Sequence, residues 1–319
     1  MDAMDVRDAM GRYMLDCRAC GLSPHTTRVY EQRLRYFLGF LERNGVRRIE
    51  EVAGDHLRGF IVELREGDAD EFTNHRRRGR KRTGRTLFHY ARIMKGWGNW
   101  LEEEEILPKS PFARVKMPRV EQRLMPIMPE EEILALDEAV ATEGSERGTR
   151  DLAIFRLLVE SGVRRGELAR LTLDDLYLDR YTLKLQGKGA KERLAFFTEA
   201  TAQALRVYLR ERPQVNAREV FLNLRTGRPL TADGIGEVLK KRGDSAGVYC
   251  RPHLLRRTFA TRYLMNGHET NLISLQKLLG HSSLDMVRQY VKMLPVDVER
   301  EYSKYAPLNG LDLREPATV

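Results

Sequence analysis

The sequence lacks several features that would place it in common classes of protein. It contains no apolar run long enough to span a membrane, and its first ten residues, MDAMDVRDAM, have no apolar core of a secretory signal. It also has no Walker-type GxxxxGK[ST] motif and no carboxylate cluster suited to Mg²⁺. These absences predict a cytoplasmic protein that has no membrane partner and needs neither a nucleotide nor a metal cofactor.

Cysteine is scarce, with 3 residues in 319. Cys17 and Cys20 form a CxxC pair, but Cys250 lies 230 residues beyond Cys20, and no second pair or nearby pair of histidines completes a zinc site. We therefore expect the cysteines to be buried or half-buried helix residues and not metal ligands.

Positive charge, by contrast, is in excess. The chain carries 55 Lys and Arg against 46 Asp and Glu, a net charge of +9. This excess favours a polyanionic partner such as nucleic acid. The 319 residues are also enough for two domains, each with its own hydrophobic core.

The first segment, residues 1–118, is expected to be helical throughout. In GLSPHTTRVYEQRLRYFLGFL, Ser23 can cap a helix and Pro24 can take its first position, after which apolar residues recur every three or four positions. A second helix ends in RIMKGWGNWL, where the apolar residues, two tryptophans among them, are expected to pack in the core. The pattern predicts an all-helical domain.

Between these helices lies HRRRGRKRTGR, residues 75–85, which we call the basic run. It holds seven cations and no acidic residue. Such a run is often a solvated loop, but in a nucleic-acid-binding protein it can neutralise backbone phosphates. Its cations, the candidate DNA-binding residues, are Arg76, Arg77, Arg78, Arg80, Lys81, Arg82 and Arg85.

An extended linker is expected after the first segment. Four prolines occur within residues 111–132, where helical periodicity is almost absent. We assign the linker to 119–125 and a second domain to 126–319. Two short alternating stretches, YTLKLQ and ERLAFF, flank GKGAK and predict paired antiparallel strands. Helices are expected at 129–141, 148–161, 198–211, 231–245, 252–266, 270–279 and 283–292. The fold class is therefore α+β, with a mostly helical second domain and a small antiparallel sheet.

Four stretches of the second domain carry candidate functional residues. Taken alone, each has an ordinary structural alternative: a surface Arg–Glu pair, an exposed turn lysine, structural histidines or a packed tyrosine. The spacing of His253 and Arg256, in a helix opened by Pro252, places both on one face. The candidates are Arg164 and Glu167 in SGVRRGELARL, Lys188 in GKGAK, His253 and Arg256 in RPHLLRRTFATRYL, and His281 and Tyr290 in LLGHSSLDMVRQY.

Together these side chains suit covalent cleavage of a phosphodiester. Guanidinium groups match phosphate geometry and stabilise the charge that grows on its non-bridging oxygens. A tyrosine, with an ordinary pKa of about 10, becomes nucleophilic when a neighbour such as histidine accepts its proton. A lysine can protonate the departing sugar oxygen.

The motifs GVRRGEL, GKGAKERL, HLLRRTFAT and LLGHSSLDMVRQY resemble those of the tyrosine recombinases, also called the phage integrase family. The resemblance spans roughly residues 145–295 and includes the nine-residue step from His281 to Tyr290. The stretch SPHTTRVYEQRLRYFLGFL is similar to the first helix of the family's core-binding domain. With no arm-binding domain expected ahead of it, the chain resembles the simple two-domain, Xer-like type.

The resemblance implies a function and a nucleophile. A member of this family cleaves and rejoins DNA at a specific site without metal or ATP, as a homotetramer in the synapse, and its two domains clamp double-stranded DNA. Tyr290 would attack the DNA to form a 3′-phosphotyrosyl link and release a 5′-hydroxyl. Arg164 and Arg256 would hold the scissile phosphate.

The remaining roles also follow from the resemblance. Lys188 would act as general acid, His253 would assist proton transfer, and His281 would hydrogen-bond the phosphate. Glu167 would support the first arginine. Arg257 departs from the family pattern, in which a histidine often stands at this position, without changing the expected mechanism.

Three alternatives remain open on the sequence alone. A type IB topoisomerase uses similar chemistry as a monomer, although the 29 residues after Tyr290 favour a tail that docks on a neighbouring subunit. A non-catalytic DNA-binding relative would lack the nucleophile or an arginine, and none is missing. A metal-dependent nuclease would use the histidines as ligands and would be sensitive to EDTA.

Overall fold

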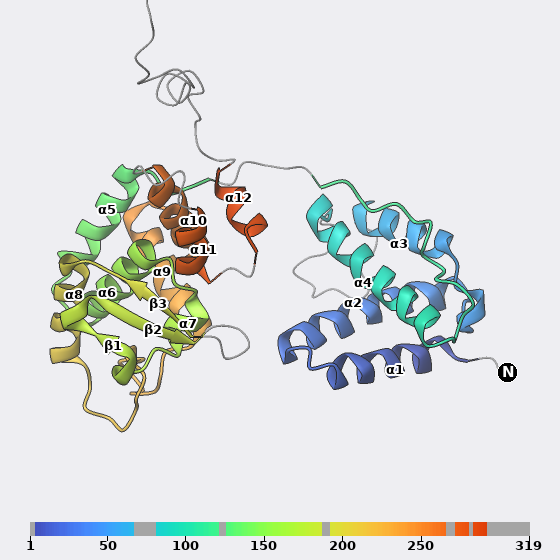
Figure 1. Cartoon of the computed structure of the whole chain (residues 1–319), viewed down its shortest axis with the longest axis horizontal. Coiled ribbons are helices and arrows are strands. Elements are labelled where there is room, and N and C mark those ends of the chain that lie inside the picture. The colour runs from blue at the N-terminus through green and yellow to red at the C-terminus, as the bar shows by residue number, and fades with distance from the viewer. Residues whose placement is uncertain are drawn as a thin grey trace, which may run out of the picture. The chain divides into compact units, whose positions relative to one another are not determined.

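Helices build the described part of the first unit. The computed structural model describes residues 4–66, 81–120, 126–186, 192–265, 272–280 and 283–291, and the chain divides into two units, Met1–Arg123 and Leu124–Val319 (Figure 1). The helices of the first unit are α1 (Val6–Ala19), α2 (Pro24–Arg43), the 3₁₀ helix η1 (Ile49–Glu51), α3 (Gly54–Glu66) and α4 (Gly84–Glu103).

Helix α2 begins as its sequence predicts. Ser23 is the N-cap, its Oγ accepts from the N–H of Thr26 at 3.2 Å, and Pro24 takes the first helical position. The apolar face of α2 is buried: Phe37 packs on Phe60 and, edge to face, on Trp97 of α4, with ring centroids 5.2 and 6.3 Å apart. The expected aromatic core of the first unit is therefore confirmed.

A glycine in α4 lets the chain after that helix lie against it. A Cβ built on Gly98 would lie 2.7 Å from the Phe112 ring and 2.9 Å from Oγ of Ser110. Phe112 is fully buried and its ring centroid lies 5.7 Å from that of Phe37. Only glycine at position 98 gives this segment room to close the core.

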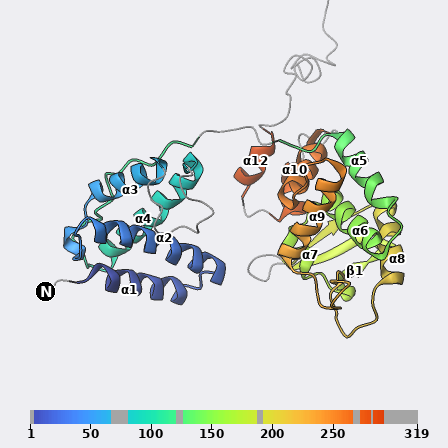
Figure 2. The same cartoon turned by 180° about the vertical axis from the view of Figure 1, so that it is seen from behind.

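The second unit is mostly helical around a small sheet. Figure 2 shows it from behind, with helices α6 and α8 side by side. Its α-helices are α5 (Glu130–Ala141), α6 (Glu146–Ser161), α7 (Arg165–Ala169), α8 (Glu199–Glu211), α9 (Ala232–Ala246), α10 (Pro252–Tyr263), α11 (Leu272–Leu279) and α12 (Asp285–Val291). Each expected helix is present, with ends shifted by at most three residues, and the short α7 carries Glu167.

The sheet has one strand more than the alternation predicted. Strands β2 (Thr182–Gln186) and β3 (Glu192–Phe196) pair antiparallel as expected, and β1 (Leu176–Tyr177) adds to β2 in the order β1-β2-β3. At two residues β1 is too short to show alternation. The inner face carries Leu183 opposite Ala195 and Leu185 opposite Arg193. The predicted fold class, a mostly helical domain with a small antiparallel sheet, is confirmed.

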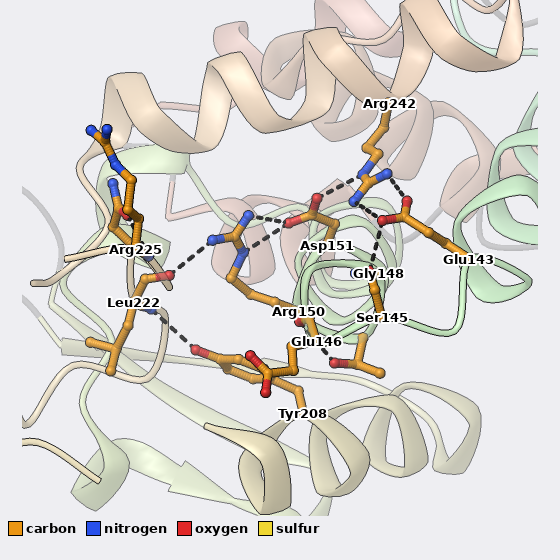
Figure 3. Close-up of polar contacts among 12 residues, drawn as sticks. Glu143, Ser145, Glu146, Gly148, Arg150, Asp151, Tyr208, Leu222, Arg225 and Arg242 are labelled. Carbon is orange, nitrogen blue, oxygen red and sulfur yellow. Dashed lines mark hydrogen bonds and ion pairs between the residues drawn. The ribbon is translucent and has the colours of Figure 1, made fainter. Parts of the chain in front are cut away.

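A buried ion-pair network ties α6 to its neighbours (Figure 3). The Arg150 guanidinium donates from Nε and Nη2 to Oδ1 of Asp151 at 2.8 and 2.6 Å, and from Nη1 to the Leu222 carbonyl at 3.1 Å. Arg242 of α9 donates to Oδ2 of Asp151 at 2.7 Å and also pairs with Glu143. The network therefore ties the N-terminal part of α6 to α9 and to the segment that carries Leu222.

The cysteines agree only partly with expectation. Cys17 is buried within α1, but Cys20 is exposed at the C-cap of that helix, where the chain turns away from the core. Cys250 is buried in the loop before α10, and burial raises the pKa of its thiol to about 12. The expectation of buried or half-buried helix residues is therefore correct for Cys17 and wrong for Cys20, while Cys250 is buried outside a helix.

Candidate active site

Arg164 lies at the junction of α6 and α7. Gly162 ends α6 with a left-handed backbone, φ 60°, which leaves Arg164 as the N-cap of α7. The backbone N–H of Arg164 donates to Oε2 of Glu167 at 2.8 Å, and its Nη1 donates to Oε1 at 3.0 Å. The contact that the spacing of these two residues predicts is present.

Glu167 is buried, and two arginines balance its charge. Besides Arg164, Nη2 of Arg193 donates to Oε2 at 2.7 Å. Burial by itself raises the pKa of Glu167, but Arg193, together with the backbone and guanidinium of Arg164, outweighs burial and holds that pKa below its ordinary value. Glu167 is therefore a charged carboxylate at neutral pH and keeps Arg164 in place.

Arg256 reaches the same region from α10. Its side chain is buried; Nη1 donates to the Gly162 carbonyl, and Nη2 donates to the Leu279 carbonyl at 2.7 Å. Burial, followed by repulsion from Arg164, lowers the pKa of Arg256. Arg164, Arg193 and Arg256 thus bring three positive charges to a region with one buried carboxylate, Glu167, so an anion such as a phosphate would offset the excess.

Tyr290 comes from α12 and faces these arginines. It is 7% exposed and packs in a small apolar cluster with residues of α10 and α11, including Ala260 and Leu279. It interacts electrostatically with Arg256 and Arg257. The structure therefore brings the candidate nucleophile and one candidate phosphate-binding arginine together, although 34 positions separate them in the sequence.

His253 occupies the first turn of α10. Pro252 is at the first helical position, as expected, and His253 is exposed. Partial burial lowers the pKa of His253, and nearby guanidiniums, with Arg165 first and then Arg256, lower it further. At neutral pH His253 is therefore uncharged and can accept a proton.

Arg193 was missed when only the sequence was considered. It lies on β3, opposite Leu185, on the face that carries the buried residues of the sheet, and its side chain is 9% exposed. Besides Glu167 it donates to the Leu278 carbonyl at the end of α11. The available signal was a cation at an inward position of an alternating strand, where an apolar residue is the rule.

Several predicted residues lie outside the described part of the chain. The structure describes neither Lys188 nor His281, and it describes only the last part of the basic run. Lys81 and Arg82 precede α4, and Arg85 is in its first turn. The residues of the basic run outside the described ranges include Arg76, Arg77, Arg78 and Arg80.

A second cluster of arginines in the first unit was also missed. Burial lowers the pKa of His89, on α4, and so do the neighbouring guanidiniums of Arg33, Arg92 and Arg85. Arg33, on α2, also lies over the Tyr90 ring, 5.0 Å from its centroid. Helices α2 and α4 thus share a positively charged surface, which no single motif in the sequence indicated.

Two classes of feature were not found in the described residues. They include no group of three or more His, Cys, Asp or Glu side chains placed to hold a metal ion. Among the helices that the structure describes, none combines the length and apolar character needed to cross a membrane.

Comparison with known families and proteins gives consistent matches. Residues 126–295 match the phage integrase family, and residues 13–91 match the phage integrase N-terminal SAM-like domain. The tyrosine recombinase XerC of Bacillus subtilis is 31% identical over 294 residues, covering 89% of this chain and 91% of that protein. The tyrosine recombinase XerD of Listeria monocytogenes is 27% identical, covering 90% and 94%.

Solved structures share the fold. The Tn1549 transposon integrase in complex with a circular intermediate DNA has a TM-score of 0.72 at 18% identity, covering 93% of this chain and 99% of that one. The XerH recombinase bound to palindromic difH substrate has a TM-score of 0.69 at 20% identity, covering 93% and 83%.

Proposed function

The chain belongs to the phage integrase family and is a tyrosine recombinase, a site-specific enzyme that cleaves and rejoins DNA, and we propose that Tyr290 is its nucleophile. The relatives named above are recombinases and integrases, and nothing in these comparisons favours the topoisomerase alternative. The observation that carries the assignment of Tyr290 is its interaction with Arg256, which lies near Arg164 and near the uncharged His253.

The proposed cleavage step uses these groups as follows. The Tyr290 oxygen bonds to phosphorus while the bond from phosphorus to the 5′-oxygen breaks, and the phenol proton leaves to His253 or to water. Arg164 and Arg256 stabilise the charge on the non-bridging oxygens. Lys188 donates a proton to the 5′-oxygen, which departs as a hydroxyl.

Rejoining reverses the same step. A 5′-hydroxyl from another strand attacks the 3′-phosphotyrosyl phosphorus, and the tyrosine oxygen leaves and recovers its proton. The bond energy stays in the protein–DNA link throughout, so the balance of bonds needs no ATP. His281 is proposed to donate a hydrogen bond to the phosphate.

In this proposal the two units have different functions. Residues 126–319 form the catalytic domain, and residues 1–118 form a core-binding domain that contacts the DNA backbone. The support for the second assignment is the charged surface of α2 and α4 around His89, next to which the basic run ends. We also propose that the active form is a homotetramer in which the two domains clamp each DNA duplex.

The nucleophile is tested with a nicked suicide substrate carrying a binding site selected from a random DNA pool. Tyr290→Phe removes one oxygen and should keep DNA affinity while it abolishes the covalent adduct. The matched control is Tyr177→Phe, because Tyr177 is an exposed tyrosine on the sheet of the same unit. An adduct of normal yield from Tyr290→Phe would contradict the assignment.

A further inference from the structure

Three arginines from different elements bind three successive carbonyls at the end of α11. Arg193 of β3 donates to Leu278, Arg256 of α10 donates to Leu279 at 2.7 Å, and Arg164 donates to Gly280 at 3.3 Å. The last carbonyls of a helix have no partner within it and carry partial negative charge, so guanidiniums satisfy both needs. The end of α11 is therefore held by the arginines of the candidate site.

Arg193 differs from Arg164 in its exposure. Arg164 is half-exposed, with 39% of its side chain accessible, whereas the Arg193 side chain is 9% exposed. One terminal nitrogen of Arg193 binds Glu167 and the other binds the Leu278 carbonyl. From inside the protein, Arg193 therefore joins the carboxylate that holds Arg164 to the end of α11.

Gly280 fits this arrangement closely. Its backbone is left-handed, φ 61°, and a Cβ built on it would lie 2.7 Å from Cδ and 3.0 Å from Nε of Arg193. The Arg193 side chain thus packs against bare backbone at the residue that precedes His281 in the sequence. Movement of Arg193 would remove two of the contacts at the end of α11, the hydrogen bond to the Leu278 carbonyl and the packing against Gly280.

We propose that Arg193 is a positioning residue, which locks Glu167, and through it Arg164, to the end of the helix that leads into His281. This rests on the proposed roles of Arg164 and His281. Because β3 also follows directly on GKGAK in the sequence, the same side chain connects the strand after Lys188 to the phosphate-binding arginine. A lysine carries its donors on one nitrogen and lacks the planar fork of a guanidinium, so it cannot reproduce two contacts made by separate terminal nitrogens.

The first experiment separates chemistry from binding. DNA affinity and single-turnover cleavage of the nicked substrate are measured for Arg193→Met and Arg193→Lys. The control is Arg206→Met, because Arg206 also pairs with a glutamate, at 2.9 Å, but is 37% exposed on α8. Arg193→Met should keep its DNA affinity and cleave about 10- to 100-fold more slowly, because a misplacement of about 1 Å in a reacting site can cost about 100-fold in rate. Arg193→Lys should be intermediate, and Arg206→Met unaffected.

A double variant tests the link to Glu167. If Arg193 acts through Glu167, the loss of rate in Arg193→Met combined with Glu167→Gln should be smaller than the product of the two single losses. If the two single losses of rate multiply in the double variant, Arg193 acts through a group other than Glu167. Wild-type cleavage by Arg193→Met, or a loss of affinity equal to the loss of rate, would also overturn the proposal.

Hydrogen exchange gives a readout that does not depend on cleavage. In Arg193→Met the amides of α11 should exchange faster, while those of α8 keep their wild-type rate. Unchanged exchange in α11 would refute the lock even if Tyr290 proved not to be the nucleophile. Conversely, if Tyr290→Phe still forms the covalent adduct, the proposed function is contradicted, but the hydrogen-exchange result for Arg193→Met remains valid.

Discussion

Replacing Asp151 by alanine removes the centre of the buried network in Figure 3. Asp151 accepts two hydrogen bonds from Arg150 on Oδ1 and one from Arg242 on Oδ2, all between 2.6 and 2.8 Å. Arg150 is 8% exposed and keeps only the Leu222 carbonyl as partner, so its charge is left buried and uncompensated. Breaking a buried pair in this way costs about 3–5 kcal/mol of unfolding free energy.

The assay is thermal or chemical unfolding of the whole chain. In a unit of this size each kcal/mol lowers Tm by about 2–4 °C, so the transition of the second unit should fall by about 6–20 °C. The control is Asp174→Ala, since Asp174 pairs with Arg218 at 3.1 Å on the surface, with both side chains at least 70% exposed. An exposed pair of this kind contributes little, and Tm should hardly change.

A compensating variant tests the cause of the destabilisation. Arg150→Met combined with Asp151→Leu removes both charges together and should recover much of the stability that Asp151→Ala forfeits, because no buried charge remains unpaired at this position. Arg242 keeps Glu143 as its partner. If Asp151→Ala has the same Tm as the Asp174→Ala control, or if the double variant is no more stable than Asp151→Ala, the network does not hold α6 in the way described.

Three further predictions concern activity. The proton acceptor must be uncharged, so the cleavage rate should fall on the acid side of its pH profile at the pKa of His253, which lies below its ordinary value of about 6.5. Arg165→Met removes the guanidinium with the largest effect on that pKa and should move this fall to higher pH. A fall that does not move would exclude His253 as the acceptor. Lys188→Ala should cleave ordinary DNA about 10²- to 10⁴-fold more slowly, because it lacks the proton donor. A substrate with sulfur in place of the bridging 5′-oxygen should restore the cleavage rate of this variant but not that of Arg256→Ala. If the sulfur substrate does not restore the rate of Lys188→Ala, another group donates the proton. In the basic run, alanine at four arginines should weaken binding to all DNA sequences alike and flatten the log–log salt dependence by about 0.9 for each phosphate that the protein no longer neutralises, and an unchanged slope would identify a solvated loop. These four are Arg76, Arg77, Arg78 and Arg80.

Local patterns in the sequence predicted most of the secondary structure. The start of α2 follows from Ser23 and Pro24, because capping and proline geometry depend only on neighbouring residues. The pair of strands around GKGAK follows from alternation over five residues on each side. The third strand could not be found in this way, since the two residues of β1 pair with β2 only through the fold.

In the candidate site, too, local sequence patterns predicted some features and not others. Taken together, the residue types at Arg164, Lys188, His253, Arg256, His281 and Tyr290 indicated phosphodiester chemistry from the sequence. The contact of Arg164 with Glu167 was also predictable, because three positions in a helix bring side chains together whatever surrounds them.

Only the tertiary structure decided how distant residues meet. Arg193 contacts Leu278 across 85 positions, Arg256 contacts Gly162 across 94, and Arg242 contacts Glu143 across 99. Such contacts depend on how whole helices and strands pack, and this packing is set by the combined burial of many apolar side chains. It produces no periodic pattern of residues at the polar positions, so the contacts cannot be predicted from the sequence pattern. The sequence by itself therefore determined which chemical groups the protein has and where its helices begin, while packing determined which carbonyl each arginine binds and which charges are buried.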